Sequence, residues 1–587
     1  MLIPLSLTIA FIVIGLLLSL ILMWAAWRHR NPQTIAEEGV PEDVRDFGPS
    51  ATNRWIKGLR AFFILLLLTV VGFHSYWVFK ADSNETFTRA KLLDRRNIRL
   101  AESGLKGWVL DRTGDLNRAL IKYKYEDGFI TRDYPLGEAA VHVTGFSDAL
   151  LGGIEYGYRD WLSKPASTYN WLASPIPVGQ DLKLSIDGDL QRFAYEQLKA
   201  TGKQSAAVVL LLPTNEVLAM ASYPSFNPNE ANDENRWRTL TDQAEDPLAQ
   251  HFSPLVNRVT GTLVTGGPTF YYHPGSTFKT FIAAIAIDNN MTNEVFTCRA
   301  EGFTPPGAHD SITDFEGEVH GRIDFADAFR VSCNQYFAQL GLKLHEKGLL
   351  LKYAQKLGFT TSPVKDIQRD EDLWLAPSAN IKNFNYIFAP PVTRMILAPK
   401  PTPYEVALQA FGQGEGDLTV ISMALIASVA ANNGQLIAPT FEAGAQPKLI
   451  TQFISPKSAA QLRQLMRSVV ESGTAAGAFA PLAGRITAGG KTGTADQPIS
   501  VVDYIDKQGK AHYRGDQWTN SWFIGFAPAD NPQIAFAVLV ENGGQGAKAA
   551  APIAEKLVEQ ALRLNTSQGQ AAQVPARSNQ QGAKPAR

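Results

Sequence analysis

Two long runs without a charged residue stand near the start of this 587-residue chain, at residues 2–27 and 61–79. A bilayer core of about 30 Å takes about 20 helical residues to cross, so each run has the length of a membrane-spanning helix. No Lys or Arg precedes the first run, whereas a secretory signal begins with basic residues. We therefore predict two retained membrane helices rather than a cleaved leader.

The charges beside these runs do not set their orientation. The loop 28–60 is basic, and so is the segment that follows residue 79. Positive-inside counting therefore gives no decision, although two spans place both ends of the chain on one side of the membrane.

Composition excludes several classes of protein. The 55 Lys and Arg residues balance 56 Asp and Glu residues, so no basic surface for nucleic acid dominates the chain. Two cysteines, Cys298 and Cys333, cannot build a disulfide scaffold or a four-thiolate zinc site. They could form one disulfide or lie buried as small apolar residues, and the sequence leaves this open. No metal site and no cofactor is predicted.

The region after residue 80 shows mixed secondary-structure patterns. A loop-rich region at 81–180 precedes an α/β domain at 181–564, and a Gln/Ala/Ser/Pro-rich tail at 565–587 is predicted to be disordered. The patterns predict strands at 106–112, 141–146 and 183–186, hairpins at 206–212 with 216–222 and at 524–529 with 533–540, and helices at 189–200, after Pro274-Gly275, and around 326–343, 417–432 and 549–564.

Three short motifs occur in order along the α/β domain: Ser276-Thr277-Phe278-Lys279, Ser332-Cys333-Asn334 and Lys491-Thr492-Gly493-Thr494. Each is weak alone, because S-x-x-K recurs at 103–106 and S-x-N recurs at 225–227 and 378–380. Ser332, taken alone, is most simply a helix cap. A P-loop ending at Lys491 is excluded, because Arg485 stands where the motif needs glycine.

The first motif has a context that suits a nucleophile. Pro274-Gly275 predicts a turn, after which Ser276 opens a helix with Lys279 one turn later on the same face. Backbone N–H groups at a helix start can stabilise an oxyanion. A serine acyl transfer with a lysine base is therefore a candidate chemistry.

The ordered set resembles the active-site serine penicillin-recognising enzymes. The middle motif departs from the usual S-D-N by its central cysteine. LSIDGDLQ (184–191), AVVLLLPTNEVLAMASYPSFNPN (207–229), FGQGEGDLT (411–419) and SWFIGFAPADNPQIAFAV (521–538) resemble the transpeptidase domain of that family. YPLGEAAVHVTGF (134–146) and GGIEYGY (152–158) resemble the N-terminal pedestal of its class B members, the class B penicillin-binding proteins.

That resemblance implies a fold and a role for each motif residue. The fold would be the penicillin-binding transpeptidase or β-lactamase-like α/β (α+β) fold, an antiparallel sheet flanked by helices, after a small pedestal domain. Ser276 would attack a D-Ala-D-Ala carbonyl, with Lys279 as base and Lys491 as the neighbouring cation. Ser332 would be the proton relay, and Asn334 would be a partner of the substrate amide. Thr492, Gly493 and Thr494 would form the substrate-binding edge. The backbone N–H groups of Ser276 and Thr494 would form the oxyanion hole.

The resemblance also implies a setting. The roughly 100 residues between the second span and the hairpin region are too few for a glycosyltransferase domain, which implies a monofunctional peptidoglycan D,D-transpeptidase. It would be acylated by β-lactams, sit in the bacterial cytoplasmic membrane with its catalytic domain outside, and work beside a membrane-embedded glycan polymerase and other cell-wall synthesis proteins. Peptidoglycan stem peptides would be its substrates, and no nucleic acid partner is expected.

Alternative functions share the chemistry up to the acyl-enzyme. A D,D-carboxypeptidase or β-lactamase would resolve the acyl-enzyme with water rather than an amine. A β-lactam sensor would carry a zinc-protease segment, but Leu349 stands where H-E-x-x-H needs its second histidine after His345. A catalytically inactive scaffold is disfavoured by the complete set of three motifs.

Overall fold

The computed structural model describes residues 105–126, 129–146, 153–165, 179–231, 233–245, 250–263, 271–357, 394–395, 400–414, 416–505 and 511–573, together with most of 58–75. The chain divides into two units, Met1–Asn97 and Ile98–Arg587.

In the first unit, residues 61–66 and 68–72 are helical, and most of their apolar side chains are exposed. The predicted span 2–27 lies outside the described residues, and the predicted span 61–79 is described only in part. Within the described ranges, no helix combines the length and the apolar character that crossing a membrane requires.

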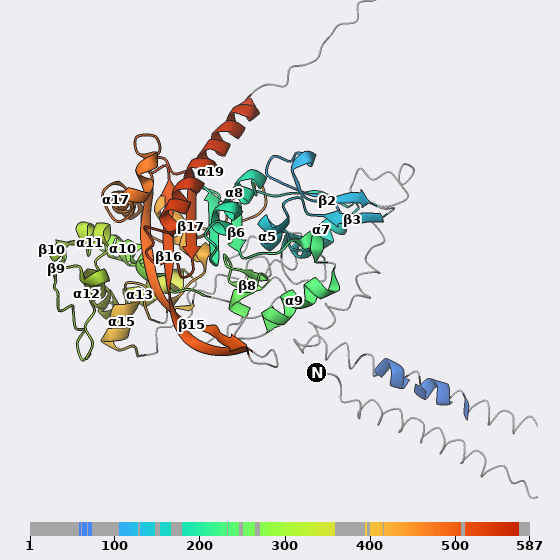
Figure 1. Ribbon diagram of the computed structural model, residues 1–587, viewed down its shortest axis with the longest axis horizontal. Helices are drawn as coiled ribbons and strands as arrows, with labels where there is room; N and C mark the ends of the chain where they lie inside the picture. Colours follow the sequence, from blue (N-terminus) through green and yellow to red (C-terminus); the bar gives the residue numbers. More distant parts are fainter. Residues whose placement is uncertain are drawn as a thin grey trace, which may run out of the picture. The chain divides into compact units, whose positions relative to one another are not determined.

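The second unit is built around a five-stranded antiparallel sheet in the order β15-β16-β17-β5-β6 (Figure 1). The strands are β5 (Ser205–Leu211), β6 (Glu216–Tyr223), β15 (Gly489–Ile505), β16 (Ala511–Ala527) and β17 (Ile534–Val540). Both predicted hairpins are therefore present. Successive residues of a strand point to opposite faces, and all seven residues of β17 are buried, so helices cover both faces.

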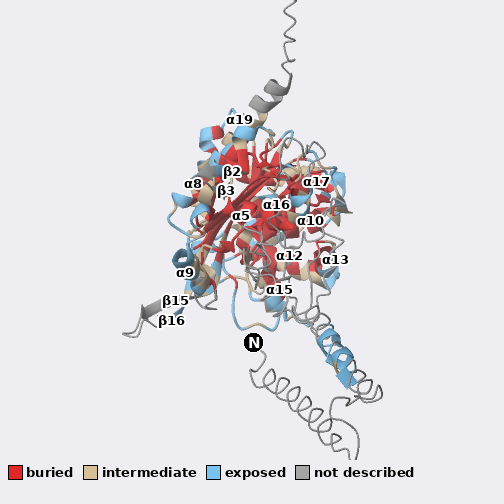
Figure 2. Cartoon of the chain, turned by 90° about the vertical axis from the view of Figure 1, so that its right-hand side faces the viewer, coloured by how far each residue is buried: buried red, intermediate tan, exposed pale blue. Residues whose placement is uncertain are grey.

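Two groups of helices cover this sheet. α8 (Gly188–Lys199) and α19 (Ala550–Gln573) pack together against it, while α10 (Lys279–Asp288), α16 (Val420–Ala431) and α17 (Pro456–Glu471) form the other group. α16 is buried along nearly its whole length, which agrees with its lack of any charged residue. Buried residues are concentrated in this sheet and the helices beside it (Figure 2). The expected antiparallel α+β arrangement is confirmed.

A smaller four-stranded sheet has the order β3-β2-β1-β4. Its strands are β1 (Val109–Leu110), β2 (Ala119–Glu126), β3 (Phe129–Asp133) and β4 (Leu182–Lys183), and short helices α6 (Ile154–Gly157) and α7 (Arg159–Ser163) accompany it. β4 pairs in parallel with β1, so the pairing joins the two regions that the sequence divides at residue 180.

Three predictions of local structure are wrong. Residues 141–146 are not a strand: α5 (Val141–Thr144) is a short helix whose four residues are all buried, so packing overrides the strand preference of Val141 and Val143. The helix expected at 326–343 is two helices, α11 (Phe325–Val331) and α12 (Asn334–Glu346), separated by Ser332 in a left-handed conformation. α19 continues to Gln573, into the tail predicted to be disordered from 565.

The other elements are short or lie at the periphery. They are η1 (Leu116–Arg118), η2 (Gly137–Ala139), η3 (Pro228–Glu230), α9 (Glu234–Glu245), η4 (Gln250–Phe252), β7 (Val256–Asn257), β8 (Thr262–Leu263), η5 (Gly275–Phe278), β9 (Val295–Cys298), η6 (Phe315–Gly317), β10 (Gly321–Asp324), α13 (Leu349–Lys356), β11 (Arg394–Met395), α15 (Pro403–Gln409), β12 (Gly416–Asp417), β13 (Gln435–Ile437), β14 (Leu449–Gln452), α18 (Ala476–Phe479) and η9 (Ala480–Leu482).

Candidate active site

Ser276 lies on η5, a single 3-10 turn that leads directly into α10. The predicted helix therefore starts as a tighter turn, and Lys279 is the first residue of the α-helix proper. Gly275 has a φ of +53°, and a Cβ there would lie 2.5 Å from the carbonyl oxygen of Thr494. Only glycine lets this turn lie so close to β15. Ser276 itself is half-buried, while Thr277 and Lys279 are buried.

Lys279 is fully buried and reaches the loop between α11 and α12. Its Nζ donates to the carbonyl oxygen of Ser332 (2.5 Å), to Ser332 Oγ (3.2 Å) and to Asn334 Oδ1 (2.7 Å). The rings of Phe337 and Phe411 lie 5.7 and 6.0 Å from the same nitrogen. Burial lowers the pKa of Lys279 to about 8, against an opposing effect of Asp314. An amine with such a pKa can accept a proton near neutral pH.

Lys491 approaches the same serine from the sheet. It lies on β15, is fully buried, and its Nζ donates to Ser332 Oγ (2.8 Å) and to the carbonyl oxygen of Thr492 (3.2 Å). Burial lowers the pKa of Lys491 well below its usual value, and the charge of Lys279 lowers it further. Two lysines thus converge on one hydroxyl. The repulsion between their charges favours a state in which only one of the two amines is protonated to the ammonium form.

The position of Ser332 depends on a break between two helices. Ser332 ends α11 with a φ of +68°, and Cys333 is the N-cap of α12. Asp314 holds the other side of this loop, because one of its carboxylate oxygens accepts from the backbone N–H of Asn334. Asn334 Nδ2 donates to the carbonyl oxygen of Thr313 at 3.2 Å. Ser332 is therefore more than a helix cap, since the bend aims its hydroxyl at both lysines.

The Lys491-Thr492-Gly493-Thr494 motif lies on β15, the edge strand of the large sheet. The hydroxyls of Thr492 and Thr474 are hydrogen-bonded at 2.6 Å, and Thr494 Oγ accepts from the backbone N–H of Gly546 at 3.2 Å. A Cβ on Gly493 would lie 2.8 Å from the Thr277 methyl group. Gly493 is thus required for packing against the nucleophile turn.

The two predicted oxyanion donors belong to neighbouring segments. Gly275, directly before Ser276, packs on the carbonyl of Thr494, so η5 and β15 are in backbone contact there. All eight predicted site residues consequently lie on three adjoining pieces of chain: η5 with the start of α10, the α11–α12 bend, and β15. Sequence reasoning missed Asp314 and Thr474, which belong to no motif and reach the site only through the fold.

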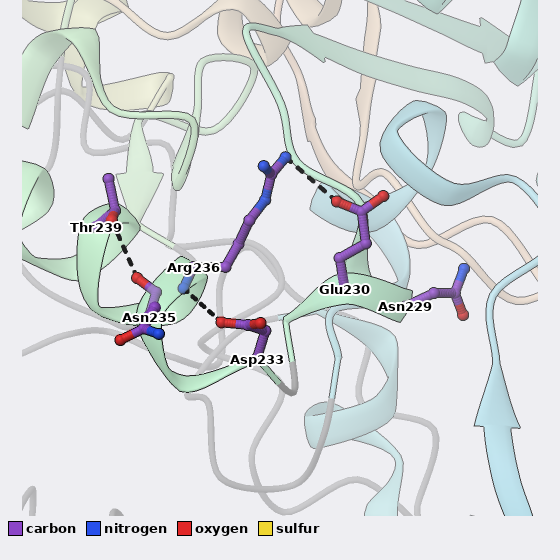
Figure 3. Close-up of a pocket in the computed structure, with 6 residues that line it drawn as sticks. All are labelled: Asn229, Glu230, Asp233, Asn235, Arg236 and Thr239. Carbon is purple, nitrogen blue, oxygen red and sulfur yellow. Dashed lines mark hydrogen bonds and ion pairs between the residues drawn. The ribbon is translucent and has the colours of Figure 1, made fainter.

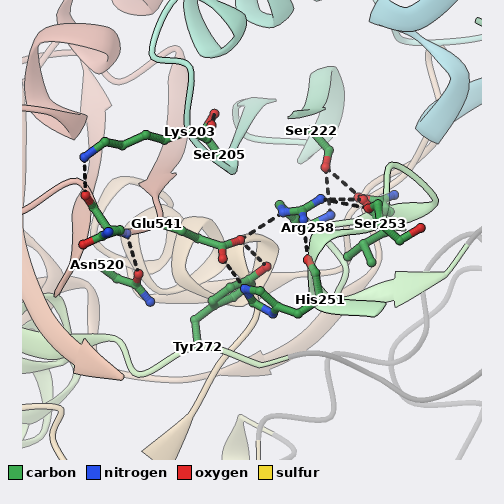
Figure 4. A network of polar contacts seen from close by, with 12 residues as sticks. Lys203, Ser205, Ser222, His251, Ser253, Arg258, Tyr272, Asn520 and Glu541 are labelled. Atoms are coloured by element: carbon green, nitrogen blue, oxygen red, sulfur yellow. Dashed lines mark hydrogen bonds and ion pairs between the residues drawn. The ribbon is translucent and has the colours of Figure 1, made fainter. Parts of the chain in front are cut away.

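A buried polar network supports the segment that leads to the nucleophile (Figure 4). Arg258 Nε donates to Glu541 Oε1 at 3.0 Å, the Tyr272 hydroxyl donates to the same oxygen at 3.1 Å, and His251 Nε2 contacts the other carboxylate oxygen. Burial by itself raises the pKa of Glu541, but His251 and Arg258 outweigh it, so the pKa is lowered. Tyr272 also exchanges backbone hydrogen bonds with Leu418, which fixes its position shortly before Ser276.

A surface pocket is lined by residues of η3, of α9 and of the segment between them (Figure 3). Its lining is polar, and Arg236 forms an ion pair with Glu230 at 3.3 Å across it. Asp233 accepts from the backbone N–H of Arg236 at the start of α9. None of the predicted site residues contributes to the lining. The pocket is therefore not a candidate for the acyl-transfer site.

The family to which the chain belongs follows from comparison with known proteins. The family model described as penicillin binding protein transpeptidase domain matches residues 205–559, which include all three motifs. The chain belongs to this family. The resemblance inferred from the sequence is thus confirmed.

Curated relatives carry transpeptidase names. The chain is 27% identical over 484 residues to the peptidoglycan D,D-transpeptidase MrdA of Acinetobacter baumannii, and the match covers 73% of this chain and 66% of MrdA. It is 27% identical over 465 residues to the peptidoglycan D,D-transpeptidase PbpA of Mycolicibacterium smegmatis, covering 74% of this chain and 82% of PbpA. The chain thus spans about two thirds of MrdA and more of PbpA.

Solved structures show the same fold. The D,D-transpeptidase domain of a peptidoglycan glycosyltransferase from Eggerthella lenta is 25% identical, with a TM-score of 0.59, and the match covers 79% of this chain and 99% of that one. Penicillin-binding protein A from M. tuberculosis, solved as its penicillin G acyl-enzyme complex, is 24% identical with a TM-score of 0.60, covering 78% and 100%. The second likeness concerns the fold alone.

Proposed function

We propose that this chain is a monofunctional, class B peptidoglycan D,D-transpeptidase. The observation that carries the proposal is the convergence of two buried lysines, Lys279 and Lys491, on the Ser332 hydroxyl, with the half-buried Ser276 three residues before Lys279 on η5. Membership of the transpeptidase family and the names of the curated relatives support the same function.

The first half-reaction forms an ester. Ser276 Oγ attacks the carbonyl carbon between the two terminal D-Ala residues, and the proton of the Ser276 hydroxyl passes to a neutral lysine amine. The C–N bond then breaks, and the departing D-Ala nitrogen receives a proton through Ser332. In the second half-reaction, the amine of another stem peptide attacks the ester, forms the cross-link and releases Ser276.

The proton positions favour a substrate-linked switch. Lys279 donates to three acceptors, an arrangement that suits an ammonium group. Lys491 has two acceptors, and its pKa is lowered more than that of Lys279. In the free enzyme we therefore place the charge on Lys279, the reverse of what the motif resemblance implies. A substrate carboxylate bound beside Thr492 and Thr494 would stabilise charge on Lys491 instead, and Lys279 would become the neutral base.

The membrane setting rests on the sequence. We assign residues 2–27 and 61–79 to two anchors, 28–60 to a cytoplasmic loop, 81–180 to a pedestal and 181–564 to the transpeptidase domain. The protein would act at the cytoplasmic membrane, with its catalytic domain outside the cytoplasm. Partners would then include a membrane-embedded glycan polymerase. A reporter that works only in the cytoplasm, fused after residue 100, should be inactive, and activity of that reporter would contradict this topology.

The chemistry is tested with the full chain in detergent and a synthetic stem peptide ending in D-Ala-D-Ala. A labelled amine acceptor should be incorporated as the terminal D-Ala is released. Ser276→Ala should abolish both products, and Ser225→Ala, in an S-x-N pattern outside the site, should leave them unchanged. Release of D-Ala with water as the sole acceptor would identify a carboxypeptidase instead.

A further inference from the structure

A cluster of four potential metal ligands lies directly behind Ser332 and takes no part in acyl transfer. It consists of Cys298, Asp314, His320 and Cys333, of which three are buried and His320 is partly buried. One ligand atom from each residue lies within 4.8 Å of the other three. Both cysteines are free thiols.

The spacing of these atoms matches a coordination shell. Cys333 Sγ lies 3.4 Å from Asp314 Oδ2, and His320 Nδ1 lies 3.6 Å from the same oxygen. Zinc bonds of about 2.0–2.3 Å in a tetrahedron place neighbouring ligand atoms about 3.3–3.8 Å apart. The side chains can therefore surround one ion with little rearrangement.

His320 gives an independent indication of a missing partner. Its Nδ1 is buried and has no hydrogen bond to any residue in the described part of the chain. Its other ring nitrogen, Nε2, lies 3.4 Å from Glu318 Oε2. A carboxylate on the outer nitrogen keeps the proton there and leaves the Nδ1 lone pair facing the cluster, as in metal-ligating histidines.

The fold brings the ligands from separate segments to one point. Cys298 ends β9 and is paired in register with Gly321, the residue after His320. Asp314 precedes η6, and Cys333 is the N-cap of α12 between Ser332 and Asn334. An ion held here would tie the β9–β10 ladder to the bend that carries Ser332.

We propose that Cys298, Asp314, His320 and Cys333 bind one Zn²⁺ in a closed tetrahedral site. Two thiolates, an imidazole and a carboxylate are ligands typical of zinc rather than of Mg²⁺ or Ca²⁺. Four protein ligands leave no position for a reactive water, so the role is structural. The ion fixes Cys333 and, through it, the orientation of Ser332 and Asn334 toward Lys279. The sequence predicted no metal, because these ligands follow no recognised spacing.

Metal analysis of the full chain tests the site. Protein purified in detergent without chelator should contain close to one zinc per chain. After chelation and reloading with Co²⁺, it should show visible bands of tetrahedral cobalt and a thiolate charge-transfer band. Cys298→Ser and His320→Gln should each lower bound metal about tenfold, whereas the matched variant His345→Gln on α12 should retain it.

Acylation assays distinguish a failure of the metal proposal from a failure of the proposed function, on which the positioning role of the ion rests. Removing zinc from the wild-type chain should slow acylation by a fluorescent penicillin about tenfold, and added Zn²⁺ should restore the rate. Ser276→Ala should bind zinc normally yet remain unacylated. The proposal is overturned if the wild-type chain takes up neither zinc nor cobalt, or if thiol titration finds Cys298 and Cys333 joined in a disulfide. Metal binding with an unchanged acylation rate would overturn the positioning role.

Discussion

Replacing Gly275 with alanine tests whether the approach of the nucleophile turn to β15 sets the reaction geometry. At a φ of +53°, an L-residue costs about 1–2 kcal/mol relative to glycine. The new methyl group would lie 2.5 Å from the Thr494 carbonyl oxygen, about 1 Å inside an ordinary contact. The turn must therefore move away from β15 by about 1 Å. A displacement of that size lowers the rate of a positioned reaction about 100-fold.

The assay is the second-order rate of acylation by a fluorescent penicillin, measured beside thermal unfolding. Gly202→Ala is the matched control, because Gly202 has a φ of +64° and no atom within 4 Å of an added Cβ. Both variants should lose about 1–2 kcal/mol of stability from backbone strain. Only Gly275→Ala should lose acylation. A Gly275→Ala rate within threefold of the wild type would refute the reasoning.

Three further changes have expected outcomes. Acylation should rise with pH through a midpoint near 8, because burial lowers the pKa of Lys279 to about 8 and only the neutral amine accepts a proton; a stopped-flow rate that does not change across that range contradicts this. Glu541→Gln leaves Arg258 buried without its carboxylate and should lower the free energy of unfolding, measured in urea titrations, by about 3–5 kcal/mol. In the wild type, the stabilisation from this ion pair should decrease as the pH falls below the usual glutamate pKa, because the fold lowers the pKa of Glu541. A loss of less than about 1 kcal/mol in the variant contradicts the first expectation. Thr474→Val removes the hydroxyl that contacts Thr492 and should raise KM about 2–10-fold with kcat retained, whereas a fall in kcat alone would assign Thr474 a different role.

The large sheet and its hairpins could be predicted because their signals are local. Apolar runs on both sides of a Pro-Thr-Asn turn specify β5 and β6, and the three motifs carry the site residues themselves. The αL bend at Ser332 could not be predicted in the same way. A continuous helical pattern covers it, and the interruption is held by contacts with Lys279, Lys491 and Asp314 from distant parts of the chain.

Residues that act through the fold carried no sequence signal. Asp314 and His320 lie in a loop without a recognised motif, and their proximity to Cys298 and Cys333 arises only when β9 pairs with β10. Gly493 also has a packing role that the motif did not indicate. A Cβ there would lie closest to Thr277 and Pro274 of the nucleophile turn, and its place on the substrate-binding edge stays a prediction.

Ser276 is the nucleophile of the proposed mechanism, and the two lysines and Ser332 activate it. The direct measurement is intact-mass analysis of the full chain after incubation with a penicillin, followed by peptide mapping of the adduct. One penicillin per chain should be found, attached to Ser276, and Ser276→Ala should carry none. An adduct on any other residue, or equal acylation of the Ser276→Ala variant, would contradict the account.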